Sequence, residues 1–189
     1  MRCVGISIQG SQSTLMMRQP DTRIDEYSGR WWVLHTKPRQ EKALARDLCH
    51  RGLDYFLPLT TATRRCGRRW ARRLLPLFPG YLFCTCSTEE DRAEVLKTNR
   101  IARMLDVRDQ ICLKDELEQL RRVLTAGKQL DIFPSIKKGR CCRVIAGSLA
   151  GLEGIVTTRR NNGRVFLSVT TLGQSAIVDI DIGSLELID

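Results

Sequence analysis

Two kinds of hydrophobic pattern follow one another along the chain. In the first, short apolar runs typical of strands alternate with segments whose apolar residues recur every three or four positions, as on one face of a helix. In the second, from residue 139 onwards, apolar and polar residues alternate with a period of two, which is typical of strands. The sequence therefore predicts four parts: a flexible leader over 1–28, an α+β domain over 29–127, a linker over 128–138 and an all-strand domain over 139–189.

The first domain is predicted to be an antiparallel sheet with helices packed on it. An apolar run at 31–34 starts the sheet, and Thr36 is placed to cap a helix that Gly52 ends. A hairpin with its tip near Gly67 is followed by a second helix, which Ser87 or Thr88 is placed to cap because acidic residues come directly after. Further strands are expected at 55–57, 81–86 and 101–107, and a last helix at 115–126.

The second domain is predicted to be a small five-stranded β-barrel. Asn162 and Gly163 form a dipeptide that strongly favours a hairpin turn. Several short strands with few residues between them are typical of a small barrel. The strands are expected at 140–145, 154–158, 164–169, 176–182 and 185–188.

Positive charge is concentrated in one segment. Lys and Arg number 31 against 21 Asp and Glu, a formal net charge of +10, yet no acidic residue occurs between Asp54 and Glu89. Clustered guanidinium groups neutralise phosphates, and an aromatic ring among them can stack on an unpaired base. The segment therefore predicts a nucleic-acid contact, with a solvated basic loop as the alternative. Its candidate residues are Arg64, Arg65, Arg68, Arg69, Trp70, Arg72 and Arg73.

The composition argues against catalysis, metal binding and membrane insertion. The eight Cys show no CxxC spacing and are joined by only two His, a pattern typical of reduced cysteines that pack as small hydrophobes in a cytosolic protein. No nucleophile motif, phosphate-binding loop or pair of carboxylates is evident, so neither an enzyme nor a cofactor is expected. The apolar stretch 74–86 is too short to cross a bilayer, and the start of the chain does not have the pattern of a signal peptide. We therefore expect a cytoplasmic protein.

Two segments resemble known families. RVIAGSLAGLEGIV at 143–156 resembles the KOW motif, a strand, a glycine-bearing loop and a second strand that open a small SH3-like barrel. WWVLHTKPRQEKALARDL at 31–48, followed by LPLFPGYLF at 75–83, resembles the amino-terminal domain of the NusG family of transcription elongation factors. The order of the two parts makes the resemblance more specific than either alone. The long basic hairpin is more similar to specialised paralogues such as RfaH than to the housekeeping factor.

The resemblance implies a factor that binds RNA polymerase without chemistry of its own. The amino domain would dock on the β′ clamp helices, reach the β gate loop and suppress pausing and termination, while the basic hairpin approaches the non-template DNA strand. Thr88, Glu90 and Asp91 are the candidates for the gate-loop contact, and helix capping explains them equally well. The docking patch on the β′ subunit maps to Trp32, His35, Phe78, Tyr81, Phe83 and Met104, although some of these aromatic residues are equally expected in the core.

The resemblance also implies partners for the barrel. Family members use it to bind ribosomal protein S10 or the termination factor Rho, often through a Pro-Phe pair where this chain has Ser148 and Leu149. The missing aromatic argues against Rho, leaves S10 open and makes Leu149 the candidate contact. We expect a monomer with no membrane partner. The alternatives are a ribosome-associated KOW protein that binds rRNA and a general nucleic-acid binder that uses only the arginine hairpin.

Overall fold

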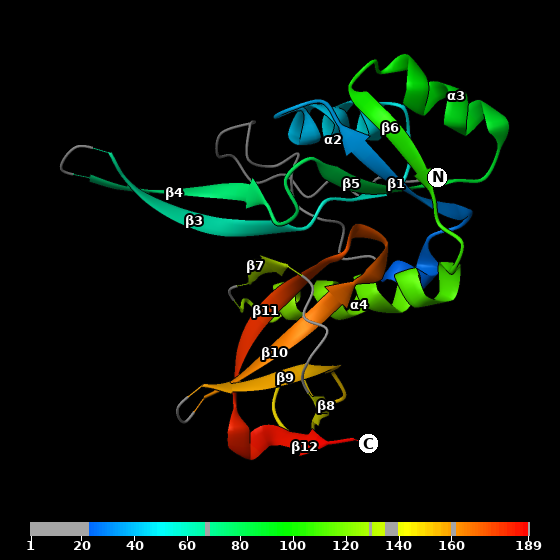
Figure 1. The fold of residues 1–189 in the computed structure, drawn as a ribbon. Coiled ribbons are helices and arrows are strands. Elements are labelled where there is room, and N and C mark those ends of the chain that lie inside the picture. Colours follow the sequence, from blue (N-terminus) through cyan, green and yellow to red (C-terminus); the bar gives the residue numbers. More distant parts are fainter. Residues whose placement is uncertain (1–22, 67–68, 129, 135–139, 160–161, 189) are drawn as a thin grey trace, which may run out of the picture.

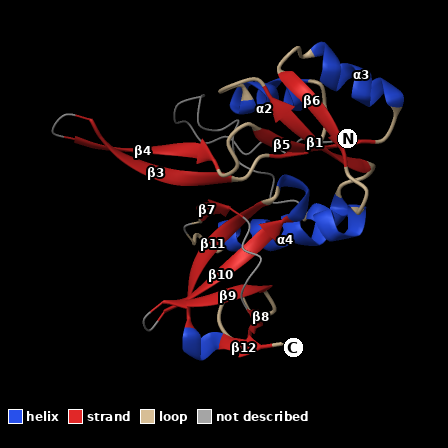
Figure 2. Ribbon diagram, viewed as in Figure 1, coloured by secondary structure: helices blue, strands red, loops and turns tan. Residues whose placement is uncertain are grey.

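The computed structural model describes residues 23–66, 69–128, 130–134, 140–159 and 162–188. These residues form a four-stranded sheet, a six-stranded sheet and a separate two-stranded hairpin (Figure 1). Figure 2 shows helices packed around the four-stranded sheet and one helix lying between the two larger sheets. Within this described part of the chain, no helix is both long and apolar enough to cross a membrane.

The four-stranded sheet is antiparallel and covered by helices on both faces. Its order is β2 (Tyr55–Phe56), β5 (Tyr81–Cys86), β1 (Arg30–Thr36) and β6 (Ile101–Asp106). Successive side chains of a strand point to opposite faces, so β1 contributes apolar residues to two separate cores. Helices α2 (Glu41–His50) and α3 (Glu89–Lys97) cover one face, and α4 (Gln110–Thr125) covers the other. The predicted α+β class, an antiparallel sheet with packed helices, is confirmed.

Two helix starts differ from the prediction. Thr36 does not cap α2: its backbone N–H donates to the carbonyl of Gly80 and keeps this residue in β1, so the helix begins only at Glu41. Helix α4 begins at Gln110, earlier than expected, because the Asp109 carboxylate accepts the N–H of Cys112 and caps it there. Thr88 does cap α3, as predicted.

The segment before β1 is part of the folded core, which corrects the expectation that all of 1–28 is a flexible leader. Ile24, in the short 3₁₀ turn η1 (Ile24–Glu26), and Tyr27 are both buried. The Tyr27 ring meets Trp31 edge-on at a centroid distance of 5.5 Å. The Ile24 N–H donates to the Glu118 carboxylate of α4 across 3.1 Å. This segment is therefore fastened to α4 by apolar and polar contacts.

The basic segment forms the hairpin, as predicted. Strand β3 (Leu59–Cys66) pairs with β4 (Arg69–Pro76) in an antiparallel register that matches Leu59 with Pro76 and Cys66 with Arg69. The hairpin projects away from the four-stranded sheet (Figure 1). Its predicted tip, Gly67, and the neighbouring Arg68 lie outside the described residues.

The six-stranded sheet contains the five predicted strands and one more. Its order is β12, β8, β9, β10, β11 and β7, and all neighbours are antiparallel. The extra strand, β7 (Asp131–Pro134), falls within the predicted linker and pairs with β11. Because β12 and β7 do not pair with each other, the sheet is not closed as the expected barrel. The remaining bounds are β8 (Arg140–Val144), β9 (Glu153–Arg159), β10 (Asn162–Val169), η2 (Thr170–Leu172), β11 (Gln174–Asp181), η3 (Ile182–Ser184) and β12 (Leu185–Leu187).

The glycines of the predicted KOW segment have structural roles, while the predicted hairpin turn is displaced. Gly147 and Gly151 adopt positive φ angles of 82° and 81° in the loop between β8 and β9. A Cβ on Gly154 would come within 2.6 Å of the Phe166 carbonyl oxygen, so only glycine lets β9 approach β10 here. Asn162 pairs with Arg159 within the β9–β10 ladder, so Asn162 and Gly163 belong to β10 and do not form the predicted two-residue turn.

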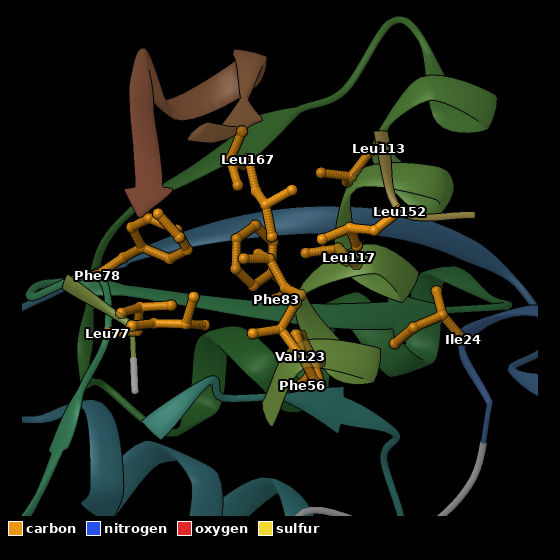
Figure 3. Packing of buried hydrophobic residues seen from close by; sticks show 14 of the residues in the cluster. Ile24, Phe56, Leu77, Phe78, Phe83, Leu113, Leu117, Val123, Leu152 and Leu167 are labelled. Atoms are coloured by element: carbon orange, nitrogen blue, oxygen red, sulfur yellow. The ribbon is translucent and has the colours of Figure 1, made fainter. Parts of the chain in front are cut away.

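One core cluster extends from the four-stranded sheet through α4 into the six-stranded sheet. Phe78 and Phe83 belong to it on the first side, and Leu152 and Leu167 on the other (Figure 3). Helix α4 connects the two sides through Leu113, Leu117, Leu120 and Val123, all buried. The two predicted domains therefore share a hydrophobic core.

Candidate functional site

The six candidate docking residues lie on opposite sides of the four-stranded sheet. Phe78, Tyr81 and Phe83 belong to or pack against the core cluster on the α4 side, and His35, paired with Tyr81, faces the same way. Trp32 and Met104 pack against the cluster on the side of α2 and α3. A single flat partner surface cannot contact both sets, so the α4 side contains the larger candidate site.

His35 and Tyr81 form the accessible part of that site. Their rings are stacked, with centroids 5.1 Å apart and planes inclined by 27°. His35 is exposed and Tyr81 is half-buried. Gly80 lies beside the imidazole, and a Cβ placed there would be 3.6 Å from two ring atoms. The turn between β4 and β5 therefore supports the imidazole while leaving the pair open to solvent.

Phe78 and Phe83 are core residues. Their side chains are 1% and 0% exposed, and their rings meet nearly at right angles with centroids 6.4 Å apart. Phe56 packs on the other side of Phe83, also at 6.4 Å. These two phenylalanines therefore support the exposed pair from below and have no surface to offer a partner in this arrangement.

Trp32 is held between two arginines on the opposite face. The guanidinium carbon of Arg92 lies 4.6 Å from the centre of one ring of Trp32, and that of Arg30 lies 5.7 Å from it. Both arginines also pair with acids, Arg92 with Glu89 and Arg30 with Asp106. Cation–π contacts and ion pairs thus anchor the half-buried indole within the protein itself.

The hairpin carries the candidate nucleic-acid residues away from the sheet. Arg72 and Arg73 of β4 are exposed. The backbone register places Arg64 opposite Ala71 and Arg65 opposite Trp70. At the base of the hairpin, the Lys42 ammonium donates to the carbonyl of Leu74, and the Thr60 hydroxyl donates to that of Leu130 across 3.0 Å. The base of the hairpin is therefore fixed to α2 and to the segment after α4.

Two of the three gate-loop candidates, Thr88 and Asp91, cap the amino-terminal end of α3. The Thr88 hydroxyl accepts the Asp91 N–H across 3.2 Å, and the Asp91 carboxylate accepts the N–H groups of Ser87 and Thr88. This reciprocal capping box satisfies backbone donors that the helix leaves open. Glu90 is exposed.

Leu149, the candidate partner contact of the second domain, is buried in the shared core. Its side chain is 4% exposed, in the turn between β8 and β9. The Arg122 guanidinium of α4 donates to the neighbouring Ala150 carbonyl, and the Glu153 N–H donates to the Gln119 side chain across 3.3 Å. In this arrangement the Leu149 side chain is not exposed, and the turn that contains it is bonded to α4.

The sequence reasoning missed the part of α4 that faces the second sheet. An open groove of about 260 Å³ lies along this domain seam, lined by residues of α4 and of the second sheet that include Glu116, Gln119, Glu153 and Phe166. Glu116 accepts two hydrogen bonds from Thr170. A signal was present in the sequence: the apolar residues that α4 buries recur every three or four positions from Leu113, earlier than the predicted helix.

Three of the described cysteines, Cys84, Cys86 and Cys142, are buried packing residues. Cys84 and Cys86 lie on one face of β5, as predicted, and both are buried. The Cys84 thiol donates to the Cys86 sulfur, which together with burial raises the pKa of Cys84, while that hydrogen bond lowers the pKa of Cys86. Among the described residues, no group of three or more His, Cys, Asp or Glu is placed to hold a metal ion.

The fold defines the class of protein: an α+β domain, a projecting hairpin that carries arginines, and an all-strand domain packed against α4. Residues 29–121 match the family model described as "Transcription termination factor nusG". The chain belongs to the NusG family of transcription factors.

A solved structure of a NusG protein has a similar fold. A structure described as "Domain interaction in Thermotoga maritima NusG" is 17% identical, with a TM-score of 0.51, and the match covers 85% of this chain and 97% of that one. The "MjSpt4:Spt5 complex" also matches, at 14% identity and a TM-score of 0.27, over 84% of this chain and 98% of that one. No curated protein sequence matches this chain significantly.

Proposed function

We propose that this protein binds RNA polymerase through the stacked pair His35 and Tyr81 and thereby suppresses pausing and termination. The observation that carries the proposal is that this pair remains accessible while Phe78 and Phe83, from the same FPGY segment and strand, form a rigid apolar floor. A partly exposed ring on a rigid support can bury a large area at little conformational cost. The partner surface would be the β′ clamp helices.

The other candidates take secondary roles. Trp32 and Met104 act through the opposite face of the sheet, where they stabilise β1 and β6 rather than contact the β′ subunit. Glu90, exposed in the first turn of α3, is the remaining candidate for the β gate loop. The seven hairpin candidates contact the non-template DNA strand, because an arginine cluster that projects from the sheet can reach phosphates without disturbing the docked domain.

The two domains divide these tasks. Residues 29–127 supply the polymerase and DNA contacts, and residues 139–189 supply a contact to ribosomal protein S10. In the structure, Arg122 of α4 bonds to the β8–β9 turn, and Leu149 in that turn is buried. An S10 contact through that turn therefore requires the second domain to leave α4. The hairpin favours a specialised NusG paralogue that acts on particular operons.

The proposal is tested with the full chain on reconstituted elongation complexes. The Tyr81→Ala variant is expected to lose affinity for core RNA polymerase and to lose the reduction in pausing. Ile111→Ala is the matched control, because Ile111 is 76% exposed on α4, away from the stacked pair. Equal binding of the two variants and the wild type would overturn the docking site. Recovery of rRNA without polymerase from cell extract would favour the ribosome-associated alternative.

A further inference from the structure

Tyr81, His35 and Arg103 form a continuous row across three neighbouring strands of the four-stranded sheet. His35 on β1 is paired with Tyr81 on β5 and, on its other side, with Arg103 on β6. Partners in an antiparallel register direct their side chains to the same face, so Arg103 lies on the α4 side with the stacked pair. The three strands can be followed side by side in Figure 1. Arg103 was not among the sequence-based candidates.

The row carries a positive charge on Arg103 that is not neutralised locally. Arg103 and His35 are both exposed, and within the described part of the chain neither forms an ion pair. The neighbouring acids are engaged elsewhere. Glu41 is 7% exposed and accepts the Gly80 N–H across 2.7 Å, Asp47 pairs with Arg100, and Asp106 pairs with Arg30.

The charge lies next to an apolar surface. Tyr81, at one end of the row, and Leu105, beside it on β6, are only partly buried and pack against the shared core cluster. Leu105 is opposite Val33, which is the next pair on the same face of these strands. A partner that covers the row therefore meets an aromatic ring, an imidazole and a guanidinium in sequence, with apolar side chains beneath them.

We infer that Arg103 is a specificity residue of the docking site, which selects a protein surface that presents a carboxylate beside an apolar side chain. The inference rests on the proposed polymerase docking and names the chemistry of that contact. A guanidinium at the rim of an apolar contact fixes orientation through a charge-assisted, bidentate hydrogen bond to a carboxylate. A nucleic-acid track is a poorer match, because phosphates are held by several clustered cations and the row contains one arginine.

Charge reversal measures the contact. In the full chain, Arg103→Glu should weaken binding to core RNA polymerase about tenfold at roughly 0.1 M salt and clearly less at about 0.5 M salt, since salt screens exposed charges. Arg108→Glu is the matched control: the same change in net charge at another exposed arginine, beyond the end of β6. This control should leave the affinity within about twofold of the wild type.

Carbodiimide coupling tests for the carboxylate directly, because it joins a lysine amine to a carboxylate at contact distance. The Arg103→Lys variant, bound to core polymerase, should yield a cross-linked peptide that pairs position 103 with an Asp or Glu of the polymerase. The inference would be overturned if Arg103→Glu bound polymerase as tightly as the wild type and no cross-link formed at position 103. The docking proposal would then remain intact. A loss of DNA affinity in Arg103→Glu without a loss of polymerase affinity would overturn the inference as well. No binding by the wild type would overturn the docking proposal itself.

Discussion

The Glu116 carboxylate of α4 accepts two hydrogen bonds from Thr170, one from the backbone N–H across 2.9 Å and one from the hydroxyl across 2.5 Å. Thr170 directly follows β10 in the second domain. On its other side, α4 packs against the four-stranded sheet. Helix α4 is therefore a structural part of both domains, and its polar and apolar contacts determine how the domains are held together.

A double-mutant cycle of Glu116→Gln and Thr170→Val should reveal coupling across the domain seam. Glu116→Gln removes the charge from these hydrogen bonds and Thr170→Val removes the hydroxyl donor, so we expect about 0.5–1.5 kcal/mol per change and a loss smaller than the sum in the double variant. Thermal and urea unfolding of the full chain measure the free energy of unfolding of each variant. Strictly additive losses would mean that the two residues do not act together.

Phe83→Ala and Tyr81→Ala should separate folding from binding. Phe83 is fully buried, so its truncation is expected to cost about 3–5 kcal/mol of stability. Tyr81 is half-exposed, so its truncation should cost mainly affinity for polymerase, about 2 kcal/mol or more. Melting temperatures and polymerase affinities, measured in parallel for both variants, separate the loss of stability from the loss of binding. Unchanged affinity per folded Tyr81→Ala molecule would assign Tyr81 to the core.

Much of the fold is predictable from the sequence because local signals and tertiary contacts agree. The apolar run predicts strand β5, the capping chemistry predicts the Thr88 cap, and the arginine-rich composition around Gly67 predicts the hairpin. The helix after β1 began late because Thr36 is bound to Gly80 from a distant turn, which no local pattern reveals. Strand β7 was missed for the same reason: its partner is β11, far along the chain.

The site was less predictable, because strand residues alternate between faces and the orientation of a strand depends on what covers it. The sequence does not reveal that β1 has a core on each side, so its pattern groups Trp32 and Met104 with residues that lie on the opposite face. Arg103 was missed because its partner His35 is 68 positions away, and only the register of β1 with β6 brings them together.

The contact of Glu118 with the amino-terminal segment should make stability depend on pH. Burial alone would raise the pKa of Glu118, but hydrogen bonds from Arg121 and from the Ile24 N–H outweigh it and hold this pKa below its usual range. A lowered pKa in the folded state contributes stability at neutral pH that is lost as the pH falls below about 4.3, the ordinary glutamate value.

The measurement compares melting temperatures of wild type and Glu118→Gln between neutral and acidic pH. The wild type should be the more stable at pH 7, and the difference should shrink as the pH falls through the carboxyl range. Glu90→Gln, at an exposed position, is the control. A difference that stays constant with pH would show that the charge of Glu118 does not hold the segment. Ile24→Ala should destabilise at every pH, by about 2–5 kcal/mol, because it removes fully buried apolar atoms.

The last prediction concerns the hairpin and distinguishes phosphate contacts from a solvated basic loop. Arg72 and Arg73 are exposed on β4, so replacing both with Gln should leave the melting temperature nearly unchanged. If both contact phosphates, the slope of log K against log salt for single-stranded DNA should become shallower by about 0.7 for each contact removed. The control replaces Arg46 and Arg108, two exposed arginines outside the hairpin, and changes the net charge equally. Trp70→Ala should instead lose affinity at every salt concentration, because stacking is worth about 1–3 kcal/mol per base and releases no counterions. Equal slopes for the hairpin and control variants would rule out the phosphate contacts.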